Sequence, residues 1–148
     1  MEWKYRTTND YIQFISFHDC VAGDIRLEKD TVVFYLEHVD ITENHPLNPF
    51  KVAKSTDRGR LEFSGVRMNE AIIYCEDGRD KEVVITDLLE LEILQFNQTF
   101  NGTNYIFEIS GIHWDEGQFC SVKVEAEKFI LEWNDYMDDA WFAGLGSK

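Results

Sequence analysis

The chain has 148 residues, of which 44% are hydrophobic and 14% aromatic, with 28 acidic against 14 basic residues. This composition predicts a single folded domain, 1–148, and argues against intrinsic disorder. The net charge of −14 repels phosphate, which disfavours nucleic acid and anionic membranes as partners. No apolar run approaches the roughly 20 residues of a membrane span, and the N-terminal residues do not read as a secretory signal. We therefore expect a cytoplasmic protein.

Alternating apolar and polar residues, with a period near two, recur along most of the chain. This period is typical of half-buried β-strands. The expected strands are 11–17, 20–28, 31–39, 60–68, 70–75, 83–85, 89–96, 105–109 and 119–133.

Two turns predict hairpins. A polar turn at 28–30 joins two apolar runs, and Asn101-Gly102 lies between two others; Asn-Gly in this setting is the strongest short-range hairpin signal. Long amphipathic helices, which a parallel sheet needs between its strands, are absent from the pattern. The predicted fold is all-β, an antiparallel sandwich or open barrel of about eight or nine strands.

Three segments depart from this pattern. Both prolines fall within 42–59, where the periodicity disappears, so we expect a long irregular loop of a kind that often carries function. The segment 86–91 has an alternative interpretation as the start of a helix capped by Thr86 or Asp87. From Asn134 onward we expect a short C-terminal helix.

The three cysteines, Cys20, Cys75 and Cys120, are widely spaced and form no Cys-x-x-Cys pair. This spacing argues against a disulfide framework and against a zinc knuckle. We interpret all three as small buried hydrophobic side chains.

His18 and Asp19 are the most enzyme-like pair, because imidazole and carboxylate groups both transfer protons and bind metals. Adjacent residues on a strand point to opposite faces, so the two side chains share a site only if the strand is interrupted. We weigh this possible polar site against a simpler interpretation, in which Asp19 occupies a turn and His18 is a hydrogen-bonded residue at a strand end.

The remaining histidines, His38, His45 and His113, are scattered, and no pair has metal-ligand spacing such as His-x-His. No phosphate-binding glycine loop, nucleophile elbow or dinucleotide fingerprint occurs. The sequence therefore predicts no catalytic residues, no metal and no cofactor.

The end of the chain crowds aromatic residues among acids, a composition that suits either a flap over the core or a protein-binding surface. We predict a partner-binding site there, with the aspartates steering a basic partner and an exposed tryptophan anchoring it. The expected residues are Trp133, Asp135, Tyr136, Asp138, Asp139 and Trp141.

The motif HDC at 18–20, with WNDY at 133–136 and AWF at 140–142, resembles small uncharacterised bacterial all-β domains. Some proteins with a comparable His-Asp motif near the start are proposed immunity proteins of toxin systems. The resemblance covers the two ends of the chain and leaves the middle unmatched. It implies a protein partner and no catalytic residues.

The expected function is a non-catalytic protein-binding domain, with an immunity-type inhibitor of a basic toxin as its specific form, because an acidic domain can cover a basic active surface. The alternative is a ligand-binding β-barrel or hydrolase-like enzyme that uses the 42–59 loop as the mouth of a pocket. A third class is a structural or regulatory domain that binds a cellular protein. The sequence does not distinguish it from an immunity-type inhibitor.

Overall fold

The computed structural model describes residues 3–88, 90–114 and 117–143, and they form an almost entirely antiparallel β structure. Most elements are strands, joined by two short 3₁₀ helices. They are β1 (Tyr5–Thr8), η1 (Asn9–Phe14), β2 (Ile15–Ser16), β3 (Val21–Glu28), β4 (Thr31–Leu36), β5 (Asp40–Ile41), β6 (Lys54–Thr56), β7 (Gly59–Ser64), β8 (Met68–Ile73), β9 (Lys81–Val83), η2 (Ile85–Asp87), β10 (Leu91–Phe100), β11 (Tyr105–His113), β12 (Gln118–Ala126), β13 (Lys128–Trp133) and β14 (Tyr136–Asp139).

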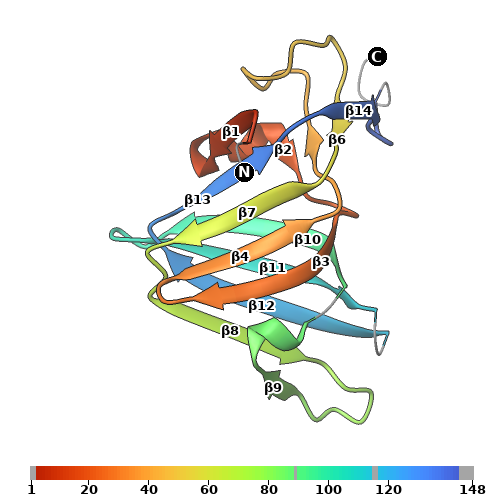
Figure 1. Cartoon of the computed structure of the whole chain (residues 1–148). Helices are drawn as coiled ribbons and strands as arrows, with labels where there is room; N and C mark the ends of the chain where they lie inside the picture. The colour runs from red at the N-terminus through yellow and green to blue at the C-terminus, as the bar shows by residue number, and fades with distance from the viewer. Residues whose placement is uncertain (1–2, 89, 115–116, 144–148) are drawn as a thin grey trace.

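Ten strands form one large sheet in the order β1-β13-β7-β4-β3-β10-β11-β12-β8-β9. Figure 1 shows β7, β4 and β3 crossing in front of β10, β11 and β12. The sheet turns where β3 meets β10, which pair over only two positions, Leu91 with Ala22 and Glu92 with Val21. The all-β antiparallel prediction is thus confirmed, with more strands than expected.

Phenylalanine rings fill the space inside the bent sheet. Phe63 of β7 and Phe107 of β11 have ring centroids 5.0 Å apart, although their strands are four positions apart in the sheet, about 19 Å if the sheet were flat. Phe96 and Phe129 pack around the same pair. One continuous sheet therefore folds over its own core, closer to an open barrel than to two separate sheets.

Both predicted hairpins are present. Glu28 pairs with Thr31 across the β3–β4 turn, and Phe100 pairs with Tyr105 across the β10–β11 turn. Gly102 has φ +96°, a left-handed conformation that glycine adopts without strain. The helix considered for 86–91 is reduced to the short η2, and Leu91 already belongs to β10.

Four short strands form a second sheet, β14-β6-β5-β2, beside one end of the large one (Figure 1). The terminal segment supplies β14, with Tyr136 opposite Thr56 and Asp139 opposite Lys54. The expected C-terminal helix is therefore a strand in the described part of the segment. The edge of β6 supplies hydrogen-bond partners that no local sequence pattern reveals.

The expected 42–59 loop is shorter than predicted, because Lys54–Thr56 is β6 and Gly59 begins β7. Asn48 organises the remaining loop: its Nδ2 donates to the carbonyl oxygens of Ile41, Thr42 and Val52 at 3.0–3.1 Å. Its Oδ1 accepts from the Phe50 N–H at 2.8 Å. The hydrogen bonds of Asn48 thus hold the loop against the rest of the protein.

Candidate functional site

The predicted polar pair lies in a turn at the corner where the large sheet bends. Asp19 has φ +66°, in the left-handed region that aspartate tolerates better than most residues. The Asp19 N–H donates to the Ile93 carbonyl at 2.7 Å, and the Ile93 N–H donates to the Cys20 carbonyl at 2.8 Å. The corner is therefore fixed to β10 on both sides of Asp19.

This turn brings His18 and Asp19 together, which regular strand geometry would not do. His18 Nδ1 donates to the Leu94 carbonyl oxygen at 2.8 Å. The other ring nitrogen, Nε2, lies 3.5 Å from Asp19 Oδ2, and both side chains are exposed. The simpler interpretation, a turn Asp beside a hydrogen-bonded His, therefore describes the pair. The two side chains nevertheless lie on the same exposed side of the turn.

The fold joins this pair to the predicted C-terminal site. The Trp141 ring lies next to the His18 ring, with centroids 5.8 Å apart and the ring planes tilted by 50°, and 58% of Trp141 remains exposed. Ala140, just before it, is buried and donates its N–H to the Ala53 carbonyl at 2.9 Å. Trp141 is therefore held at the surface by an anchored backbone.

Trp133 and Tyr136 do not belong to that surface. Trp133 is fully buried and stacks on Tyr5 at 5.5 Å, so its predicted role as a surface anchor is wrong. The Tyr136 hydroxyl donates to the Leu47 carbonyl at 2.7 Å, and burial raises its pKa to about 12. These two rings attach the 42–53 loop to the body of the protein.

The three predicted aspartates are all exposed, but their surroundings differ. Asp139 is paired with Lys54 Nζ at 2.7 Å. Within the described ranges, Asp135 and Asp138 have no ion-pair partner. Their charge is therefore available to a partner, whereas that of Asp139 is largely neutralised.

A second cluster of polar side chains, able to offer metal ligands, lies next to this turn, where β3 begins. Cys20, His38 and Asp40 each offer one ligand atom, and the three atoms lie within 4.8 Å of one another. Cys20 and Asp40 are buried and His38 is half-buried. The hydroxyl of Ser55 donates to Asp40 Oδ1 at 2.6 Å, while Asp40 Oδ2 has no hydrogen-bond partner among the described residues.

The sequence-based expectation that these histidine and cysteine side chains are isolated is therefore corrected for Cys20 and His38. The missed signal is His38-Val39-Asp40, because residues two apart on an extended segment project to the same side. Cys20 joins them because β3 and β4 are hairpin partners, so the residues flanking the open end of the hairpin are neighbours.

A cavity of about 590 Å³ opens on the outer face of β3 and β4. Its walls include Trp3, Tyr35, Arg26 and Arg58. The Arg26 guanidinium lies 5.5 Å from the centre of the Tyr35 ring, and its Nε donates to Asp24 at 3.0 Å. The cavity thus combines aromatic surfaces with two arginines and three acids, Asp24, Glu37 and Asp57.

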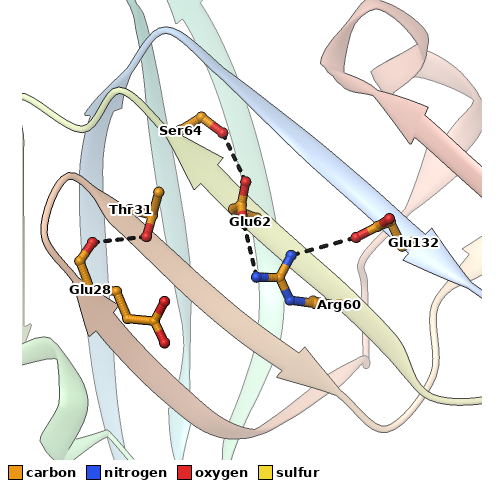
Figure 2. A network of polar contacts seen from close by, with 6 residues as sticks. All are labelled: Glu28, Thr31, Arg60, Glu62, Ser64 and Glu132. Carbon is orange, nitrogen blue, oxygen red and sulfur yellow. Dashed lines mark hydrogen bonds and ion pairs between the residues drawn. The ribbon is translucent and has the colours of Figure 1, made fainter. Parts of the chain in front are cut away.

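Beyond the cavity, the same outer face is covered by a charge network, shown in Figure 2. Arg60 contacts Glu62 at 2.9 Å and Glu132 at 3.5 Å, and Ser64 donates to Glu62 at 3.1 Å. Arg60 is thus already neutralised by two carboxylates, and the network is a half-buried group of ion pairs on the sheet face.

No protein-family model, curated protein or solved structure matches this chain. None of its described helices has the length and apolar character needed to cross a membrane.

Proposed function

We propose that this protein is a non-catalytic binding domain that engages a basic protein through a terminal surface made of His18, Asp135, Asp138 and Trp141. One observation carries the proposal: Trp141 is more than half exposed, although its backbone is fixed by the buried Ala140. A large aromatic ring held in place at the surface is the side-chain type that most often anchors protein interfaces.

The charges of the surface favour a basic partner. Asp135 and Asp138 have no counter-ion among the described residues, and the whole chain carries a net charge of −14. Complementary charge raises the rate of encounter and disfavours acidic partners. The resemblance to proposed immunity proteins agrees with this chemistry, so an inhibitor of a basic toxin is the specific form of the proposal.

The test uses Trp141→Ala as the changed chain. Wild-type and variant protein are immobilised, exposed to extract of the source organism, and every captured protein is identified; the product of any adjacent toxin-like gene is also purified and tested directly. Loss of the ring should weaken the Kd of the specific partner by about 10- to 100-fold, the range of an aromatic hot spot.

Phe119→Ala is the matched control, because Phe119 is 63% exposed but lies on β12 of the large sheet, away from the terminal surface. It should leave the Kd unchanged. A partner whose Kd responds to Phe119→Ala and not to Trp141→Ala would place the binding surface elsewhere, and absence of any partner would remove the support for this function.

The cavity beside Trp3 and Tyr35 supports a second candidate, the binding of a small ligand. Its volume lies in the range of ligand pockets, and its aromatic walls suit a planar molecule, while Asp24, Glu37 and Asp57 in the lining disfavour an anionic one. Asp57, Arg58 and Gly59, at the end of the predicted 42–59 loop, form part of the wall. Ligand-induced chemical-shift changes at Trp3 and Tyr35, with none at Trp141, would favour this candidate.

A further inference from the structure

Three side chains from separate elements meet behind the corner of the large sheet. Cys20 immediately precedes β3, His38 lies between β4 and β5, and Asp40 begins β5. Their ligand atoms lie within 4.8 Å of one another. Thiolate, imidazole and carboxylate together form a donor set typical of zinc and chemically related divalent cations.

Asp40 supplies an independent indication of a missing partner. Its side chain is buried, and Ser55 satisfies only Oδ1. Oδ2 has no hydrogen-bond donor in the described part of the chain. Buried polar atoms are nearly always paired, because an unpaired one loses its hydration without compensation. A cation bound at Oδ2 would provide that compensation.

The surroundings of Cys20 argue against a catalytic role for the same three groups, that of a Cys-His-Asp nucleophile. A nucleophilic cysteine needs a lowered pKa and access to its substrate. Cys20 is fully buried, and both burial and the nearby Asp40 charge raise its pKa. Its thiol donates over long distances, 3.6 Å to the Ser16 carbonyl and 3.9 Å to the His18 carbonyl. The trio therefore does not resemble an activated Cys-His-Asp nucleophile.

A bound divalent cation would favour the charged forms of Cys20 and Asp40, which burial disfavours. It stabilises the thiolate and the carboxylate at once, which two neighbouring anions cannot do for each other in a buried site. Of the three side chains only His38 is partly exposed, so a metal ion would reach the site from the side of His38. With bonds of about 2.0 Å to nitrogen and oxygen and about 2.3 Å to sulfur, tetrahedral ligand atoms lie about 3.3–3.5 Å apart. Side-chain movements of about 1 Å therefore suffice to close the site.

We propose that Cys20, His38 and Asp40 form a mononuclear site for a borderline-soft divalent cation, with Zn²⁺ as the expected ion and water at the fourth position. The site would cross-link the open end of the β3–β4 hairpin to the small sheet. This proposal is independent of the terminal binding surface.

Cobalt is the probe, because Co²⁺ takes the same ligands as zinc and reports on them spectroscopically. Adding Co²⁺ to the reduced, metal-stripped full chain should give a sulfur-to-cobalt charge-transfer band and intense tetrahedral d–d bands, saturating at a stoichiometric amount. Zinc should displace the cobalt and abolish both features. Cys20→Ser and His38→Gln should each weaken binding by about 100-fold or more, as expected when a ligand is lost.

Cys75→Ser and His18→Gln are the matched controls, since Cys75 is a half-buried thiol outside the trio and His18 is a neighbouring imidazole. Both should keep the spectrum and the affinity. Circular dichroism of each metal-free variant identifies misfolded protein, and half-buried His38 makes His38→Gln the variant least affected by core packing. Absence of the charge-transfer band in wild type, its persistence in Cys20→Ser, or dependence on His18 instead of His38 would overturn the assignment.

Discussion

At the scale of single residues, His45 shows how one buried side chain holds a long loop. Its Nδ1 accepts a hydrogen bond from the Leu47 N–H at 3.0 Å, so the neutral ring carries its proton on Nε2. Nε2 lies 2.9 Å from the hydroxyl oxygen of Thr7 on β1, to which it donates. Burial lowers the pKa of His45, because protonation would place a charge where water is excluded.

This arrangement predicts a pH dependence of stability. The unfolded chain gains a proton at His45 near its ordinary pKa of about 6.5, whereas the folded chain takes that proton only at lower pH. The free energy of unfolding should therefore decrease as the pH falls below about 6.5, with His45 contributing no more than about 1.4 kcal/mol per pH unit. Urea denaturation between pH 7.5 and pH 5.5 measures this slope.

His45→Gln removes the titration and should give a shallower slope over the same range. Slopes are compared instead of absolute stabilities, because the substitution also changes the contacts to Thr7 and Leu47. Other groups with altered pKa values, such as Asp40, are common to both chains and cancel. Identical slopes in the two proteins would contradict the assignment to His45.

At the scale of elements, a bulge in β10 fixes the corner that carries His18. The β10–β11 register shifts between Ile93 and Gln95, which leaves Leu94 without a ladder partner on β11. The Leu94 carbonyl instead accepts the hydrogen bond from His18 Nδ1. Gly111 lies opposite Ile93, and any Cβ there would overlap the backbone carbonyl oxygen of Glu92. The close approach of these strands therefore requires glycine.

Gly111→Ala should lower the free energy of unfolding by about 1–3 kcal/mol, because backbone must move to admit the methyl group. Gly23→Ala is the matched control within β3, where an added Cβ meets nothing within 4 Å. It should change stability by no more than about 0.5 kcal/mol. Urea denaturation of the two variants decides the matter, and equal effects would show that strand approach at the bulge is not tight.

At the scale of the whole molecule, the net charge of −14 sets a field that a partner meets before contact. Asp135 and Asp138 are exposed, the first just before β14 and the second within it, a few residues before Trp141. In the proposed complex these acids act on the rate of encounter, whereas Trp141 acts on the lifetime of the complex.

The double substitution Asp135→Asn with Asp138→Asn should therefore slow association several-fold at low salt and flatten the dependence of the association rate on salt. Asp80→Asn with Glu82→Gln changes the net charge equally at the exposed β8–β9 end and is the control. Stopped-flow association with the purified partner measures both. If the two double variants slow association equally, net charge alone is responsible and the terminal surface has no special part in steering.

Period-two alternation and turn residues such as Asn101-Gly102 act within a few residues, so the sequence predicted both hairpins and the long strands of the large sheet. It missed β1, β5, β6 and β14, and the predicted strand 11–17 is a strand only at Ile15–Ser16, because 11–14 belong to η1. The simpler interpretation of His18 and Asp19, a hydrogen-bonded His next to a turn Asp, agrees with the structure, and Asp135, Asp138 and Asp139 are exposed as expected. The sequence could not tell Trp133 from Trp141: both are tryptophans among acids, and one is buried against Tyr5 while the other remains exposed on His18.

The tertiary structure alone decided which distant residues meet. Cys20 approaches His38 and Asp40 because the β3–β4 hairpin brings its open ends together, and the left-handed Asp19 turns the chain at that point. The terminal segment became a strand instead of a helix because β6 offers an unpaired edge. Such pairings depend on hydrogen-bond and packing partners far along the chain, and these partners leave no trace in local periodicity.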